Sequence, residues 1–251
     1  MVQFSGVATL LKAKYPLIKS FHCMAHRLEL AVKNAVDTVN VASQFRIFMD
    51  ELYKVYSMSP QNLAELQAVA DSFAIEILKV QKVFDIRWVF SSYVAVRSVL
   101  HDYAALNQHF VNNCSQESAR TSKEKCKYKG LLKKLNSWIF VDETCLLKDG
   151  LRCLKQLSLY LQNNDSNIIH AMDHVDNLRE KMLALKVSNG RTLNKFLESF
   201  AVGGCYKGVS ITKSESDDLK FEAFRSQFFQ ALHDNVVQRF PSTDILTAAR
   251  V

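Results

Sequence analysis

The stretch LELAVKNAVDTV, residues 28–39, carries the pattern that decides the predicted fold class. Its apolar side chains recur three and four positions apart, at Leu28, Ala31, Val32, Ala35, Val36 and Val39. An α-helix completes a turn every 3.6 residues, so this spacing places them on a single face. The stretch therefore predicts an amphipathic helix that begins near His26, with helical character continuing to about Val55.

Similar spacing recurs along most of the chain, which favours a mainly α fold. Glycine and proline are scarce, at 7 and 3 of 251 residues, whereas an all-β sandwich or barrel needs many turn residues. Loops are expected over 112–121, 163–167 and 203–217, and a short strand over 17–21. Helices are expected over 5–14, 60–77, 91–111, 128–135, 146–161, 168–186, 192–201 and 218–240.

The chain is basic, and its positive charge is concentrated in one segment. The formal net charge is +7, and between residues 120 and 134 a single acid, Glu124, stands among seven basic side chains. These are Arg120, Lys123, Lys125, Lys127, Lys129, Lys133 and Lys134. Such a run can contact phosphate groups of any nucleotide sequence, with an affinity that falls as salt rises. The alternative is a solvated loop and helix face, and both interpretations stay open.

The cysteines indicate neither a secreted scaffold nor a metal centre. The six are widely spaced, and no apolar run approaches the roughly 20 residues that cross a bilayer, so we expect reduced thiols and no membrane contact. Cys23 and His26 have half the spacing of a zinc site, but a structural zinc needs four ligands. His170 and His174 share a helical face without an evident third ligand. No metal and no cofactor is therefore predicted.

No catalytic motif is visible, although one pair of residues could bind a base. The sequence contains no Gly-rich phosphate loop, no Gly-x-Ser-x-Gly and no His-Glu-x-x-His, and its carboxylates are expected on solvated helix faces. Arg87 and Trp88 precede a predicted helix. The Trp ring could stack on an unpaired base while the Arg holds its phosphate. Spacing alone favours a core Trp beside a surface Arg.

Several motifs, taken in order, resemble hAT-superfamily transposases, in particular copies domesticated in animal zinc-finger proteins. Each motif alone is weak, whereas their order is specific over residues 5–100. They are SGVATLLK (5–12), YP (15–16), HCMAHRLELAV (22–32), IRW (86–88), SSY (91–93) and AVRSVL (95–100).

The resemblance implies a fold and a set of functional residues. The family has an RNase H-like catalytic core interrupted by a helical insertion domain, so residues 1–30 would be a remnant of that α/β core and residues 31–251 the insertion domain. In the family the Trp that matches Trp88, beside Arg87, stacks near a flipped base. Cys23 and His26 match the box beside the catalytic centre. The resemblance also implies DNA as a partner and a nuclear location.

The three metal-binding acids of the family have no counterparts in this sequence. Met1 matches the Met that ends the family's Asp-Gly box, so two of the acids would lie upstream, and the third would follow Val251. We therefore expect no catalytic residue and no enzymatic activity in this chain.

Three functions remain open from the sequence. The first is a catalytically inactive, transposase-derived protein that binds nucleic acid or a protein partner. The second is a fragment of an active hAT transposase whose catalytic acids lie outside the chain. The third is a helical protein-interaction module without DNA binding. The sequence indicates no oligomeric state.

Overall fold

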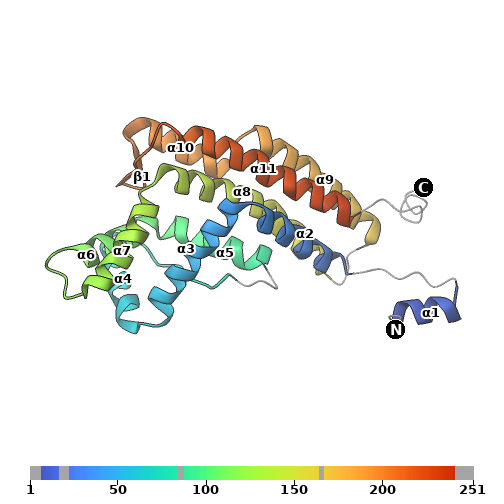
Figure 1. Cartoon of the computed structure of the whole chain (residues 1–251), viewed down its shortest axis with the longest axis horizontal. Helices are drawn as coiled ribbons and strands as arrows, with labels where there is room; N and C mark the ends of the chain where they lie inside the picture. Colours follow the sequence, from blue (N-terminus) through green and yellow to red (C-terminus); the bar gives the residue numbers. More distant parts are fainter. Residues whose placement is uncertain (1–6, 17–22, 84–87, 164–166, 241–251) are drawn as a thin grey trace.

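The computed structural model describes residues 7–16, 23–83, 88–163 and 167–240, and it is mainly helical, as the sequence predicts (Figure 1). The helices are α1 (Val7–Lys14), α2 (Met24–Thr38), α3 (Asn40–Ser57), α4 (Pro60–Ser72), α5 (Trp88–His101), α6 (Tyr103–Cys114), α7 (Ser122–Leu135), α8 (Trp138–Leu161), α9 (Ile168–Val187), α10 (Arg191–Gly203) and α11 (Asp217–Arg239). A two-stranded hairpin, β1 (Cys205–Tyr206) and β2 (Val209–Ser210), lies between α10 and α11.

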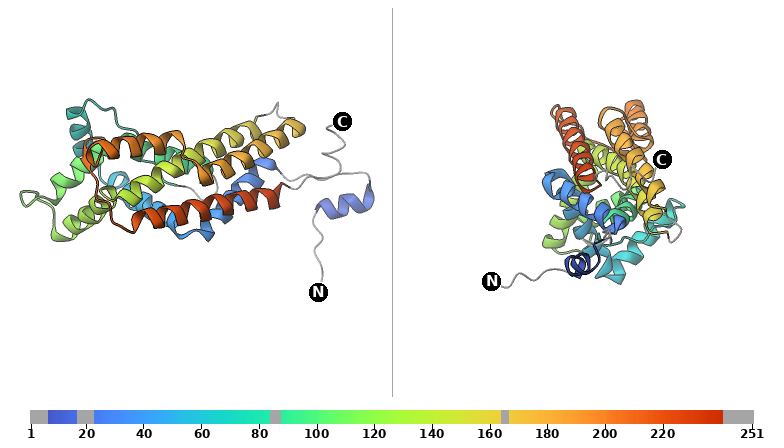
Figure 2. Two further views of the ribbon diagram at one scale, coloured as in Figure 1. Left: turned by 90° about the horizontal axis from the view of Figure 1, so that it is seen from above. Right: turned by 90° about the vertical axis from the view of Figure 1, so that its right-hand side faces the viewer.

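The long helices α8, α9 and α11 run side by side along the molecule (Figure 2). α11 also packs on α2, and α8 packs on α5 and α10. A smaller group, formed by α4, α6 and α7, lies at the end of the molecule that is on the left in Figure 1. None of the described helices combines the length and the apolar character that spanning a bilayer requires.

The apolar stripe from Leu28 to Val39 is buried, which confirms the prediction that it faces a core. The helix itself is shorter than predicted. Val39 has an extended backbone, with φ −116° and ψ 108°, and its N–H bonds to the carbonyl of Val36. The expected helix to Val55 is therefore two helices, α2 and α3, and the side chain of Val39 stays in the core where they join.

A second expected helix, over 91–111, is also divided in two. Asp102 separates α5 from α6 and is fully buried. Both of its carboxylate oxygens accept from the N–H of Leu78, at 3.1 Å each, and one also contacts Nδ1 of His101 at 2.7 Å. Leu78 follows α4, which ends at Ser72 although the apolar spacing predicts a helix to residue 77.

Two further expectations need correction. α8 begins at Trp138 and has 24 residues, because its whole length packs between neighbouring helices, whereas the predicted helix begins at residue 146. The expected loop over 203–217 contains the hairpin. Its two central residues, Lys207 and Gly208, have φ of 50° and 79°, the left-handed pair that a tight two-residue hairpin turn requires.

The N-terminal expectations are only partly covered by the described residues. α1 begins at Val7 and lies apart from the other helices in Figure 1. The candidate strand over 17–21 and the centre of the expected turn over 163–167 lie outside the described residues. The domain boundary expected after residue 30 falls inside α2, whose buried face continues without interruption from Leu28 to Val36.

Candidate nucleic-acid interface

The basic segment forms the N-terminal cap and the exposed face of α7. Thr121 is the N-cap: its hydroxyl accepts from the N–H of Glu124, and its own N–H donates to Glu124 Oε2 at 2.9 Å. This reciprocal pair is a capping box, which satisfies two backbone donors at the start of a helix. Tyr128, Leu131 and Leu135 are buried and fix α7 against α6.

The lysines of α7 occupy most of its solvent side. Lys123, Lys127, Lys129 and Lys133 are exposed, while Lys125 and Lys134 are partly buried. Lys125 Nζ lies 3.4 Å from the carbonyl of Gln116. In the described part of the chain, no ion pair involves a lysine of α7. The four exposed lysines therefore present uncompensated charge.

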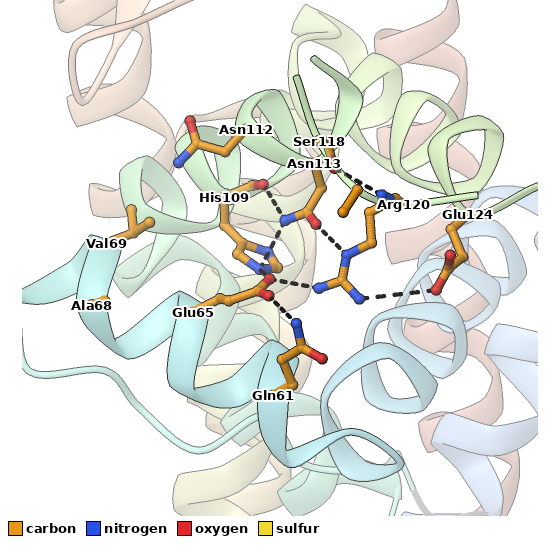
Figure 3. Close-up of a pocket in the computed structure, with 11 residues that line it drawn as sticks. Gln61, Glu65, Ala68, Val69, His109, Asn112, Asn113, Ser118, Arg120 and Glu124 are labelled. Atoms are coloured by element: carbon orange, nitrogen blue, oxygen red, sulfur yellow. Dashed lines mark hydrogen bonds and ion pairs between the residues drawn. The ribbon is translucent and has the colours of Figure 1, made fainter. Parts of the chain in front are cut away.

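Arg120 differs from these lysines, since its guanidinium is already held by the protein (Figure 3). Its side chain is only 14% exposed. It donates to Asn62 Oδ1 and Glu65 Oε2 on α4, both at 2.6 Å, and to Asn113 Oδ1 on α6 at 2.7 Å. Although predicted as a phosphate contact, Arg120 in this structure joins α4 and α6 at the start of α7.

The polar network around Arg120 continues inward to His109. Tyr56 Oη lies 2.9 Å from His109 Nδ1, and Glu65 Oε2 lies 3.3 Å from His109 Nε2. Burial lowers the pKa of His109, so its ring is neutral at pH 7. Partial burial opposes ionisation of Glu65, but hydrogen bonds from Arg120 and Gln61 hold the pKa of Glu65 below its usual value.

These side chains border a pocket of about 530 Å³ between α4, α6 and α7 (Figure 3). Its cation and its carboxylates are bonded to one another: Arg120 contacts Glu65 and, at 3.9 Å, Glu124. The groups that could act on a ligand are thus occupied in holding three helices together. The pocket is a structural junction that positions the lysine face of α7.

Trp88, the predicted base-stacking residue, lies in the core. It is the first residue of α5 and is 4% exposed, as in the alternative interpretation of a core Trp. Among the described residues, its Nε1–H has no hydrogen-bond partner. Arg87 lies outside the described residues. Since the ring faces are covered in this structure, base stacking by Trp88 stays a prediction that requires the start of α5 to open.

The four residues weighed as metal ligands and set aside, Cys23, His26, His170 and His174, are exposed. Cys23 and His26 lie at the start of α2, and Cys23 makes no side-chain capping hydrogen bond. His170 Nδ1 is 3.9 Å from Asp173 Oδ2, and the ring of His174 lies 4.1 Å from that of Tyr160. Over the described ranges, no three His, Cys, Asp or Glu side chains are grouped so as to hold a metal ion.

Sequence reasoning missed the buried carboxylates. Asp102, Asp142, Asp149 and Asp217 are all buried, so the expectation that carboxylates occupy solvated faces is wrong for them. Asp149 accepts from the N–H groups of Thr192 and Leu193 and so caps α10, and Asp217 accepts from the N–H of Ser214. The partners of Asp149 lie 43 and 44 positions away on another helix, where residue spacing gives no signal, whereas Ser214 is only three positions from Asp217.

Sequence reasoning also missed a second cluster of cations, where α5, α8, α10 and the hairpin meet. Two signals could have indicated it. Lys148 and Arg152 are four residues apart on one helix, and Arg191 and Lys195 are four apart on another. Like charges at this spacing share a helix face and repel each other.

Comparison with known proteins adds no identification. No protein-family model matches the chain, and no solved structure gives a significant match. The candidate interface therefore depends on the geometry described above.

Proposed function

We propose that this chain binds nucleic acid through the lysine face of α7, by contacts to phosphate groups that do not read the bases. The observation that carries the proposal is a set of four exposed lysines on one helix that have no carboxylate partner in the described ranges: Lys123, Lys127, Lys129 and Lys133. Lysines that neutralise phosphates release condensed counterions, and this release supplies sequence-independent affinity.

The rigidity of α7 supports the proposal. The helix has a capping box at one end and three buried side chains along its inner face. Arg120 ties its start to α4 and α6. A rigid helix presents its charges at fixed spacing, so little ordering entropy opposes binding.

We also propose to which class of protein the chain belongs and where in the cell it acts. On the motifs quoted above, the chain is a catalytically inactive relative of hAT transposases that acts in the nucleus. Three of the four buried aspartates named above, Asp102, Asp149 and Asp217, each accept a backbone N–H, which supports a structural role for these three. We expect no metal-dependent nicking of supercoiled DNA. Nicking that disappears on substitution of an Asp or Glu of this chain would overturn this part.

The test is the salt dependence of DNA binding. A fluorescent duplex is titrated with the chain and with a variant carrying Lys123→Gln, Lys127→Gln, Lys129→Gln and Lys133→Gln. The matched control replaces four exposed lysines elsewhere, Lys12, Lys33, Lys54 and Lys181, by Gln. Both variants lose the same net charge, so only the position of the charge differs.

The α7 variant should bind more weakly, and its log Kd against log salt slope should fall by roughly 2 to 4, at about 0.9 per phosphate contact. The control should keep most of the wild-type slope. Equal losses in both variants would show that binding follows net charge rather than α7. Absence of DNA binding by the wild-type chain would favour a helical protein-interaction module instead.

A further inference from the structure

A pocket of about 420 Å³ opens where α5, α8, α10 and the hairpin meet, and six basic side chains line it. They come from four elements, so no single helix face accounts for the cluster. They are Arg97 of α5, Lys148 and Arg152 of α8, Arg191 and Lys195 of α10, and Lys207 of the hairpin turn. We call this set the cation pocket.

The cation pocket contains no carboxylate among its lining residues. The nearest acids serve other groups, since Asp149 accepts from the N–H groups of Thr192 and Leu193 and Asp102 accepts from Leu78. Across the ranges that the structure describes, no ion pair includes any of the six cations. The compensation that remains is longer-range, from Asp149 on Lys148 and from Asp102 on Lys207.

The arrangement opposes the stability of the empty protein. Lys148 with Arg152, and Arg191 with Lys195, are like-charge pairs one helical turn apart, and each such pair costs about 0.2–0.5 kcal/mol. Arg191 is also the first residue of α10, where the helix dipole disfavours a cation. A fold without a ligand at this position would gain by placing other residues there.

Lys207 shows a similar cost in the backbone. Its φ of 50° lies in the left-handed region, where Asn or Gly is the favoured residue in this type of turn. The lysine is nonetheless present, and its Nζ donates to the carbonyl of His101 at 3.0 Å, at the end of α5. This contact holds the ammonium group at the rim of the cation pocket.

Burial and neighbouring cations lower the pKa of two of the six side chains, Lys148 and Lys207. Burial lowers the pKa of Lys148, and Arg97 and Arg152 lower it further, while Cys145 and Asp149 oppose the shift. Burial also lowers the pKa of Lys207, with Lys148 adding to the effect. An anion in the pocket would oppose both shifts.

We propose that the cation pocket binds a compact anion that carries several phosphate groups. Six convergent charges exceed what one phosphate can neutralise, and the pocket is concave, unlike the convex lysine face of α7. Three of the six are arginines, whose planar guanidinium groups bind phosphate oxygens in pairs. Tyr93, Thr192 and Tyr206 also line the pocket.

The test uses inositol hexakisphosphate, inorganic triphosphate and inorganic phosphate as probes, with isothermal titration calorimetry and thermal unfolding of the full chain. Inositol hexakisphosphate should bind at least about a hundredfold more tightly than inorganic phosphate, because each added charged contact contributes about tenfold. It should also raise the Tm as its concentration rises above its Kd.

Two variants locate the site. Lys148→Gln with Arg152→Gln, and separately Arg191→Gln with Lys195→Gln, should each weaken inositol hexakisphosphate binding by about tenfold or more. Both should have an unliganded Tm equal to or above that of the wild type, because each removes a repulsive pair. The matched control, Lys123→Gln with Lys127→Gln on α7, has the same spacing and should bind the probe like the wild type.

Equal weakening by the α7 control would overturn the proposal, as would similar affinities for inositol hexakisphosphate and inorganic phosphate. A competition arm separates the sources of the phosphates. An oligonucleotide with a 5′-triphosphate that displaces the probe, while its 5′-hydroxyl form does not, would identify a nucleic-acid end as the source. Displacement by neither form would identify a free polyphosphate. Equal displacement by both forms would overturn the proposal of a compact anion. Because α7 is unaltered in both pocket variants, DNA binding through α7 can fail or succeed independently.

Discussion

Arg120 has a different role from the lysines that follow it in the basic segment. It stands first in a basic run, yet its guanidinium bonds to Asn62, Glu65 and Asn113 rather than facing solvent. The remaining members of the run keep their charge available. The basic segment is therefore divided between one residue that supports the fold and lysines that can contact a ligand.

Replacing Arg120 should destabilise the chain without removing a DNA contact. Arg120→Gln loses charge-assisted hydrogen bonds and leaves Glu65 without its cation, which we expect to lower the free energy of unfolding by about 2–4 kcal/mol. Urea denaturation measures the loss, with Lys127→Gln as an exposed control. The salt slope of DNA binding should stay at the wild-type value. A stability within error of the wild type would contradict the role assigned to Arg120.

Asp142 gives the chain a pH-dependent stability. It is fully buried on α8, and neither carboxylate oxygen has a hydrogen-bond partner within the part of the chain that the structure describes. Burial raises the pKa of Asp142 to about 8 against the opposing effect of Lys213. Burial and the neighbouring Asp142 likewise raise the pKa of Glu143 to about 8.

The sign of the effect follows from these shifts. Between about pH 4 and 8 the folded chain holds a proton on Asp142 that the unfolded chain has released, so stability should fall as pH rises through this window. Asp142→Asn should reduce this fall and stabilise the chain more at pH 8 than at pH 5, at ~1.4 kcal/mol for each pKa unit that is removed. Thermal unfolding at both pH values measures it. Exposed Asp37→Asn is the control, and a wild-type pH profile in Asp142→Asn would refute the assignment.

At the scale of elements, α10 depends on a close approach between its cap and α8. Asp149 of α8 accepts from the N–H groups of Thr192 and Leu193, which replaces a local N-cap side chain. Gly190 is the residue just before α10. A Cβ at this position would lie 2.3 Å from Asp149 Oδ2 and 2.6 Å from Asp149 Cβ. Only glycine fits between the two helices.

Gly190→Ala should therefore separate α10 from Asp149. We expect a loss of about 1–3 kcal/mol in the free energy of unfolding, since the clash involves the Asp149 Cβ as well as the carboxylate. Gly130→Ala on α7 is the matched control, because nothing lies within 4 Å of its added Cβ. That control should stabilise the chain by about 0.5–1 kcal/mol, as for any exposed helical glycine. Equal stability changes in the two variants would rule out the close approach.

The whole molecule shows which features the sequence could predict. The buried faces of α2 and α11 were predictable because they depend only on local spacing. Successive apolar residues recur about one helical turn apart, from Leu28 to Val36 and from Phe221 to Leu232. The breaks at Val39 and Asp102 were not, since Asp102 is held by Leu78, 24 residues away. The concentration of basic residues in α7 was predictable from the sequence. The hydrogen bonds from Arg120 to α4 were not, because they join residues that are 58 and 55 positions apart. The cation pocket draws on four elements and has no continuous counterpart in the sequence.

The junction at Arg120 has a consequence for how the molecule opens. The guanidinium of Arg120, just before α7, donates hydrogen bonds to α4 and α6 and lies 3.9 Å from Glu124 of α7. A local opening that frees α7 must therefore release α4 at the same time. In native-state hydrogen exchange, the amides of these three helices should exchange as one cooperative unit, with the capped first turn of α7 protected as well as its buried middle. In the Arg120→Gln variant, α7 should exchange ahead of α4.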